Sequence, residues 1–192
     1  MGKTSSKQKG AAEPKPKFME EESVTPSQPK ERNVGTFGNS GVQKGLIGQL
    51  ILFTPEELRR RTGHLDMNKV VEGYDIRVIN FASEDRYRRL YLHMAKLCNV
   101  ILFIYDTEDR KTYEAIPGWM KDASEWQQPN VELMLVGNIV NKDKQREVKI
   151  EEAEKFAFDR EMMYFELCAS EDNGIGIRQK VLEAIVKYDT QA

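Results

Sequence analysis

Short apolar runs alternate with amphipathic stretches from about residue 32 to the end of the chain. Two runs, Val100–Tyr105 and Val131–Gly137, are continuous, which is typical of parallel strands buried on both faces of a sheet. Met162–Leu167 is a shorter run, and Lys69–Ile79 has the pattern of two short strands around a turn. Asn33–Phe37 is expected to be the first strand, although it has few β-branched residues. The pattern therefore predicts a sheet with strands from the whole of this region.

Helices are expected in the intervals between the strands. Five stretches have a helical pattern, namely Leu46–Phe53, Arg86–Leu97, Thr112–Trp126, Ile150–Phe158 and Gly176–Tyr188. Another helix should begin after Thr54, which can cap it, with Pro55 as its first residue and Glu57 completing a capping box. Pro117 lies inside the third stretch and should kink or delay that helix, because proline has no backbone N–H.

Strands separated by helices predict an α/β fold with a mostly parallel central sheet, helices on both faces and right-handed crossovers. The chain has 192 residues, of which 40% are hydrophobic and 31% charged. This composition fits a single globular domain of about 155 residues. We expect a leader over residues 1–32, the domain over residues 33–189 and a short end over residues 190–192.

The leader differs in composition from the rest. Its first 17 residues contain five Lys and one Glu, a net charge of +4. It has few large apolar side chains, so it should be disordered. Gly2 follows Met1, and Ser6 lies four residues after Gly2. This spacing fits the pattern for N-myristoylation, although a Gly after Met also occurs by chance in a basic tail. One acyl chain binds membranes only marginally, with an association constant of about 10⁴ M⁻¹, so stable attachment needs a second signal. The basic segment of the leader supplies it.

Charge and composition make several other classes of function improbable. The net charge of −2 gives no general attraction to nucleic acid, and no nucleic-acid partner is expected. Two Cys and two His provide neither a metal cluster nor a disulfide framework, so a reducing compartment is the simpler interpretation. No apolar run approaches the roughly 18 residues of a membrane span, and no secretory signal is recognisable. We expect a cytoplasmic protein, peripheral on the cytosolic face of a membrane.

The loop Gly38–Gly45 lies between the first strand and the first helix, where a glycine-rich loop can bind phosphate through backbone N–H groups. The full pattern is G-x-x-x-x-G-K-[ST]. Gly38 and Lys44 have the required spacing, whereas Gln43 replaces the second Gly and Gly45 replaces the hydroxyl residue. An ordinary strand-to-helix turn is the alternative interpretation.

A resemblance over a longer part of the chain supports the interpretation of Gly38–Gly45 as a phosphate loop. Phe103–Tyr113, followed by Ile116 and Trp119, resembles the strand, Tyr-Asp-x-Thr turn and helix of Ras-superfamily small GTPases, and the Rab branch is the closest. Leu133–Asn138, Glu151–Ala153 and Phe156–Ala157 continue the resemblance in order. It extends from about Asn33 to Tyr188 and implies the small-GTPase-like, P-loop fold.

The resemblance also implies which residues would bind nucleotide. The family's positions are retained at Gly38, Gly41, Lys44, Asn138 and Ala169. At the phosphates, Gln43 should intrude where the family has Gly, and Gly45 lacks the hydroxyl that binds Mg²⁺. In the stretch that resembles Asp-x-Ala-Gly-Gln-Glu, the Asp is Asn80, the Gly is Ser83 and the water-orienting Gln is Glu84. Thr62 is only a loose match to the family's metal-binding Thr.

Base recognition is altered in the same way. Asn138-Ile139-Val140-Asn141 resembles the family's Asn-Lys-x-Asp, so Ile139 replaces the Lys and Asn141 replaces the Asp. An Asn cannot accept two hydrogen bonds from the guanine edge, and losing a charge-assisted bond of roughly 1.5–3 kcal/mol lowers affinity about tenfold to a hundredfold. Cys168-Ala169-Ser170 retains only the Ala of the family's Ser-Ala-Lys.

These substitutions favour a Rab-like pseudo-GTPase, with no catalytic residue and little or no GTP binding, that acts as a protein-binding or scaffold module in membrane-associated trafficking or assembly. No cofactor is expected in that case. One alternative is a divergent switch that binds GTP or GDP with Mg²⁺ and has residual activity. Another is a structural subunit of a cytoskeletal or ciliary complex.

An effector-like protein partner should bind the surface formed by Thr54–Asp66 and Asn80–Leu92, which correspond to the family's nucleotide-gated switch segments. Its arginines, Arg59, Arg60, Arg61, Arg86, Arg88 and Arg89, could contact an acidic partner or simply face solvent. Rab-like proteins usually end in a tail with prenylated cysteines, whereas Tyr188–Ala192 contains no Cys. We therefore expect membrane attachment at the leader.

Overall fold

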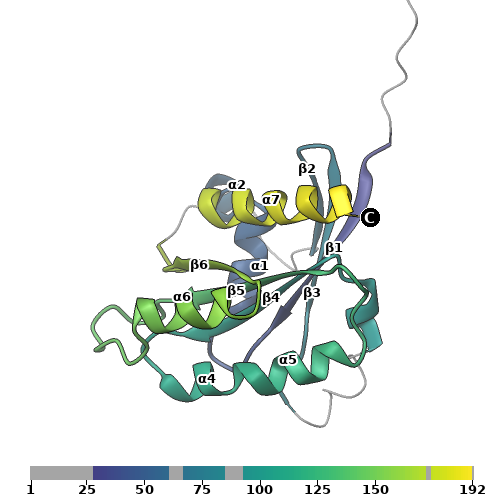
Figure 1. Ribbon diagram of the computed structural model, residues 1–192. Helices are drawn as coiled ribbons and strands as arrows, with labels where there is room; N and C mark the ends of the chain where they lie inside the picture. The colour runs from purple at the N-terminus through teal and green to yellow at the C-terminus, as the bar shows by residue number, and fades with distance from the viewer. Residues whose placement is uncertain (1–27, 61–66, 85–92, 172–173, 192) are drawn as a thin grey trace, which may run out of the picture.

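The computed structural model describes residues 28–60, 67–84, 93–171 and 174–191. Six strands form one sheet in the order β2-β3-β1-β4-β5-β6 (Figure 1). The strands are β1 (Lys30–Phe37), β2 (Asn68–Val71), β3 (Tyr74–Asn80), β4 (Val100–Asp106), β5 (Glu132–Asn138) and β6 (Met163–Leu167). Neighbouring strands are parallel except β2 and β3, which form an antiparallel hairpin. The predicted α/β class and mostly parallel sheet are confirmed.

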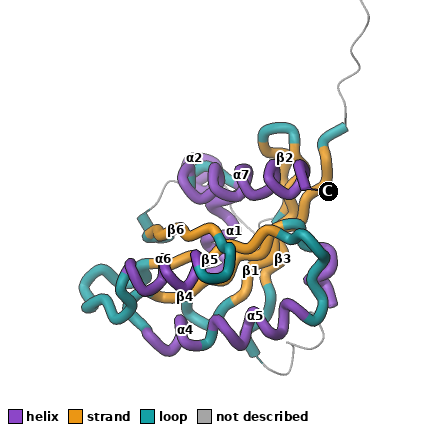
Figure 2. Tube along the Cα trace, in the orientation of Figure 1, coloured by secondary structure: helices purple, strands orange, loops and turns teal. Residues whose placement is uncertain are grey.

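Helices cover both faces of this sheet (Figures 1 and 2). They are α1 (Lys44–Leu52), α2 (Pro55–Arg60), α4 (Arg110–Glu114), α5 (Ile116–Ser124), α6 (Ile150–Phe158) and α7 (Ile175–Gln191). Side chains of α1 and α7 share one apolar core with the sheet, and side chains of α4, α5 and α6 share the other. The continuous apolar run of β4 supplies both cores, because Leu102 faces α1 and α7 while the adjacent Phe103 faces the opposite side.

Two predicted helices differ from the structure. The stretch Thr112–Trp126 is divided into α4 and α5, and the break lies at Ala115. Pro117 occupies the first turn of α5, where a missing N–H is tolerated, so the predicted defect is confirmed. The prediction over Arg86–Leu97 lies partly outside the described residues, and its described part is the 3₁₀-helix η1 (His93–Leu97).

The first strand begins earlier than the predicted boundary at residue 32. Lys30, Glu31 and Arg32 pair with β3, and the backbone N–H of Lys30 donates to the carbonyl of Gly73 at 3.3 Å. The Nζ of Lys30 lies 3.1 Å from the Asp189 carboxylate, and Arg32 donates its Nε to the same carboxylate at 2.9 Å. These ion pairs fix the start of β1 to the end of α7, which continues to Gln191 instead of ending at the predicted Tyr188.

The start of α7 depends on a glycine. Gly174 has a φ of 75°, and a Cβ there would lie 2.5 Å from the carbonyl oxygen of Leu50. We expect Gly174→Ala to lower the unfolding free energy by about 2 kcal/mol or more, because backbone atoms cannot yield as a side chain can. Gly118→Ala is the matched control, since a Cβ at Gly118 would meet nothing within 4 Å. Urea titration of both variants measures the difference, and equal stabilities would contradict the expectation.

Candidate nucleotide site

The loop Gly38–Gln43 joins β1 to α1 at the carboxyl edge of the sheet, where α/β proteins commonly bind ligands. Gly38 has a φ of 146°, and a Cβ there would lie 2.3 Å from the carbonyl oxygen of Ile104. Gly41 has a φ of 90° and open space around it. Both glycines therefore have a conformational reason to be present.

Gln43 also lies in the left-handed region, with φ 59° and ψ 33°, which is uncommon for a residue other than Gly. Its side chain turns toward the base-recognition segment, where Oε1 accepts a hydrogen bond from Nδ2 of Asn138 at 3.1 Å. Nδ2 of Asn138 also donates to the Val42 carbonyl at 3.3 Å, and its Oδ1 accepts from the Ala169 N–H at 2.9 Å. Asn138 thus connects the loop, β5 and the segment after β6.

The amine of Lys44 is surrounded by protein acceptors. Lys44 is only 8% exposed, and its Nζ donates to the carbonyls of Gly38 at 2.6 Å and Asn39 at 3.1 Å. Its third contact is with Oγ of Ser83, at 2.6 Å, and this hydroxyl can donate to the Gly38 carbonyl at 3.2 Å. Burial lowers the pKa of Lys44 to about 8, and the nearby Glu84 carboxylate opposes the shift.

Two positions implied to hold Mg²⁺ carry no anionic ligand. Asn80 presents an amide, and its Oδ1 accepts from the Thr36 hydroxyl at 3.1 Å. A Cβ added to Gly45 would have only one neighbour within 4 Å, Nδ2 of Asn80 at 3.6 Å. Within residues 28–60, 67–84, 93–171 and 174–191, no group of three or more His, Cys, Asp or Glu side chains could hold a metal ion. The space for a hydroxyl side chain at Gly45 remains, although the residue lacks one.

The segment Asn138–Asn141 is held by a residue that the sequence analysis did not select. Glu108 is 6% exposed, and its Oε2 accepts from the backbone N–H groups of Val140 at 2.9 Å and Asn141 at 3.2 Å. Its Oε1 accepts a short hydrogen bond from Thr107. Burial raises the pKa of Glu108, but these hydrogen bonds outweigh it, so the pKa is lowered overall. Glu108 stands at the Thr position of the Tyr-Asp-x-Thr turn, and an acidic residue two positions after the end of a buried strand was the available signal.

Truncation of Glu108 should therefore loosen this segment. We expect Glu108→Ala to lower the unfolding free energy by about 3 kcal/mol, because two backbone donors lose a charged acceptor. Glu108→Gln retains the shape and one acceptor oxygen, and should lose less. Chemical denaturation, with amide exchange at Val140 and Asn141, checks both effects. A Glu108→Ala protein as stable as the Gln variant would contradict the expected contribution of the remaining acceptor oxygen.

Other site residues lie around a hollow beside the loop. Its volume is about 620 Å³, and it is lined by Asn39, Ser40, Ser83, Glu84, Ala115, Gly118 and Trp119. Nε1 of Trp119 donates to Oδ1 of Asn39 at 2.9 Å, which fixes the loop to α5. Glu84 is exposed at the edge of this hollow. Ile139 is half-buried and Asn141 is exposed, whereas Gly2 and Thr62 lie outside the described residues.

The first segment of the predicted partner surface contains α2, which is held by its own contacts. Thr54 and Glu57 cap it reciprocally, at 2.8 Å and 3.3 Å, so the predicted capping box is confirmed. Glu57 also pairs with Lys69 of β2 at 2.5 Å, and this hydrogen bond is the main reason that the pKa of Glu57 falls to about 2. Arg59 and Arg60 are exposed on α2, and Arg61, Arg86, Arg88 and Arg89 lie outside the described residues.

The sheet order and the position of the loop define a small-GTPase-like domain. Residues 58–188 match the Ras family, and the chain belongs to this family. The match begins after the loop Gly38–Gly45. In the described residues, no helix combines the length and apolar character needed to cross a bilayer.

The similar curated proteins include Rab proteins. The human Ras-related protein Rab-4B is 31% identical over 94 residues, which cover 49% of this chain and 44% of that protein. Rab-26 of Bos taurus is 28% identical over 124 residues, 65% of this chain and 47% of the relative. RabJ of Dictyostelium discoideum is 28% identical over 151 residues, which cover 76% of this chain and 59% of that protein. The chain thus spans about half the length of the curated relatives it matches.

Proposed function

We propose that this Ras-family chain is a Rab-like pseudo-GTPase, which binds a protein partner and has little or no capacity to bind or hydrolyse GTP. The observation that carries the proposal is the contact set of Lys44. Its amine donates to two loop carbonyls and to the Ser83 hydroxyl, so three protein acceptors match its three N–H donors. A phosphate would have to displace at least one of them.

The surrounding charges support the same conclusion. Glu84 stands where the family has its water-orienting Gln, and a carboxylate at this position would repel a triphosphate. Gly45 and Asn80 supply neither the hydroxyl nor the carboxylate that would hold Mg²⁺. Hydrolysis by the family's mechanism depends on that ion and on an oriented water. None of the residues implied for these two roles is present.

The proposed partner surface includes α2 and the exposed side chains of Arg59 and Arg60. Reciprocal capping and the Glu57–Lys69 pair hold α2 through contacts within the domain itself. A segment fixed by its own contacts presents one surface at all times, in contrast to a nucleotide-gated switch. Two adjacent guanidinium groups suit an acidic partner.

Nucleotide content is the direct test. Freshly purified protein is denatured, the supernatant is run on anion exchange, and GTP, GDP, XTP and ATP are titrated with Mg²⁺ by calorimetry. No released nucleotide and no heat at high micromolar ligand are expected. Stoichiometric GDP or GTP, or micromolar binding of either, would overturn the proposal.

A divergent switch is the second candidate, and the geometry of Asn138 favours it. Asn138 still bonds the Val42 carbonyl and the Ala169 N–H, so the framework of a base-binding corner remains. Asn141 offers an amide donor that would match the C2 carbonyl of xanthine better than the amino group of guanine. Preferential binding of XTP over GTP would support this candidate.

We also propose that acylated Gly2 and the basic leader attach the protein to a cytosolic membrane surface. Mass spectrometry after coexpression with an N-myristoyltransferase should find one added acyl group, which Gly2→Ala should abolish. Flotation with anionic vesicles should then recover the acylated protein but not Gly2→Ala. Equal recovery of the acylated protein and of Gly2→Ala would contradict a role of the acyl chain in membrane attachment.

A further inference from the structure

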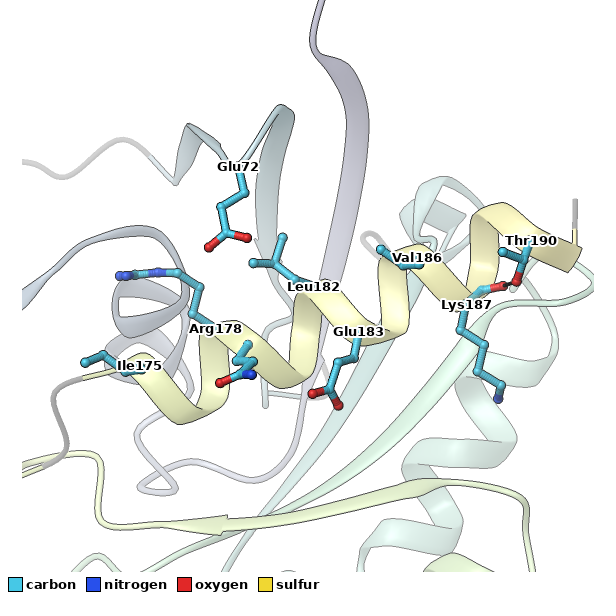
Figure 3. Close-up of a pocket in the computed structure, with 9 residues that line it drawn as sticks. Glu72, Ile175, Arg178, Leu182, Glu183, Val186, Lys187 and Thr190 are labelled. Carbon is cyan, nitrogen blue, oxygen red and sulfur yellow. Dashed lines mark hydrogen bonds between the residues drawn. The ribbon is translucent and has the colours of Figure 1, made fainter.

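A groove runs along the outward face of α7 and is unrelated to the nucleotide site. Its volume is about 640 Å³, within the roughly 300–1,000 Å³ typical of binding clefts. Ile175, Leu182 and Val186 supply apolar side chains, and Glu72 of the β2–β3 turn lies above Leu182 (Figure 3). We call this surface the α7 groove.

The apolar side chains of the α7 groove exceed the needs of the fold. Ile175 is 59% exposed and Val186 is 49% exposed, although both lie on a helix whose opposite side fills one of the two cores. Ile175 and Val186 lie 11 positions apart, about 16 Å along the helix, and Leu182 between them is 8% exposed. Exposed apolar side chains that line one concave surface are typical of a docking site. An occupant with large apolar side chains would bury them.

The start of β1 places the leader at one end of this groove. The Lys30 N–H bonds the carbonyl of Gly73, which directly follows Glu72 of the groove. The Lys30 amine pairs with Asp189, which directly precedes the groove residue Thr190. Figure 1 shows the start of β1, the β2–β3 turn and the end of α7 together. The chain therefore enters the domain beside the Thr190 end of the groove.

The leader carries apolar residues at a distance that the chain can span. Phe18 and Met19 are adjacent in the sequence, and Met19 precedes Lys30 by 11 positions. An extended segment of this length reaches at most about 36–40 Å. The 17 residues of α7 measure about 25 Å. Phe18 and Met19 can therefore reach any part of the groove.

Charge favours one direction for this segment. Glu20–Glu22 lie between the apolar pair and the entry point, so they would come near Lys187. Lys15 and Lys17 lie beyond the apolar pair, toward the far end. Glu72 lies above Leu182 and Arg178 in Figure 3, and Glu183 pairs with Lys180. A segment laid from the Thr190 end toward Ile175 thus places its three glutamates near Lys187, which also pairs with Glu132.

We propose that the α7 groove binds the segment Lys15–Glu22 of the same chain, with Phe18 and Met19 against Leu182 and Val186. The contact is intramolecular and does not depend on whether the loop Gly38–Gly45 binds nucleotide. It would hold the basic leader against the domain and cover the exposed side chain of Val186.

Paramagnetic relaxation tests the contact in the full-length chain. A nitroxide is attached to Cys at position 12 in an Ala12→Cys/Cys168→Ser protein, in which Cys98 is buried. The amide signals of Ile175 and Gln179, at the far end from the entry point, should lose most of their intensity. Phe158 on α6 is exposed elsewhere and should keep its signal. The same protein with Phe18→Ser/Met19→Ser should regain the signals, and identical profiles in the two proteins would overturn the proposal.

Two further measurements identify the occupant. Val186→Glu changes an exposed groove residue and should restore the Ile175 signal while the sheet amides remain unchanged. Unchanged broadening in this variant would contradict docking in the groove. A mixture of spin-labelled protein without isotope and isotope-labelled protein without spin label should show no broadening. Broadening in the mixture would mean that a second copy provides the segment, which would overturn the intramolecular assignment.

Discussion

A chain with five family side chains restored should bind GDP with Mg²⁺ more tightly than the natural sequence, by a factor on the order of 10³. The changes are Gln43→Gly, Gly45→Ser, Asn80→Asp, Ile139→Lys and Asn141→Asp. The factor combines two independent gains in binding free energy, one at the metal and one at the base, each roughly 1.5–3 kcal/mol.

The structure has room for these changes. A Cβ at Gly45 meets no atom closer than 3.6 Å, and Gln43→Gly places glycine where φ is already positive. Calorimetry measures the affinity, and urea titration checks that the restored chain is folded. Lys44→Met added to the restored chain is the control, and it should abolish most of the gain. If the restored chain folds but does not bind GDP, these five side chains do not account for the weak nucleotide binding expected of the natural sequence.

The second large effect is a pH dependence that originates at Lys44. Its pKa is about 8 in the folded chain and 10.5 when unperturbed, so the unfolded chain binds more protons between these values. The unfolding free energy should therefore rise with pH through this range, by at most about 3 kcal/mol. Below pH 8 Lys44 is protonated in both the folded and the unfolded chain, so it adds no pH dependence to the unfolding free energy.

Lys44→Met isolates this contribution, because it removes the titrating group and keeps an unbranched apolar stem. Unfolding free energies of both proteins are measured below pH 8 and near pH 10, so that the other titrating groups cancel in the difference. The natural chain should gain stability relative to Lys44→Met as the pH rises. Parallel pH profiles would mean that the amine is solvated in the folded state.

The fold followed from the sequence because hydrophobic patterns are local. The run Val100–Tyr105 is apolar at every position, which only a strand covered on both faces requires, and β4 is such a strand. Pro117 likewise acts through its own backbone, so its effect on the helix was predictable. The start of β1 was not, because Lys30 and Arg32 are placed by Asp189, a residue distant in the sequence.

The site was predictable in its residues but not in its contacts. The loop spacing located Lys44 and the family resemblance located Ser83, yet only the fold brings their side chains together. Gln43 was expected to intrude among the phosphates, whereas its side chain turns toward Asn138. Glu108 was missed because its two backbone partners lie on a loop 32 and 33 positions later. Sequence spacing does not specify such a geometry.

The position of β1 has a mechanical consequence. This strand lies between β3 and β4 and is parallel to both, and Lys30 at its start continues directly from the leader. Tension applied through a tethered leader would act along the strand axis. It would load the hydrogen bonds on both sides of β1 in shear, and many bonds would have to break together. An attachment through the leader would therefore load a strand whose geometry resists being pulled out of the sheet.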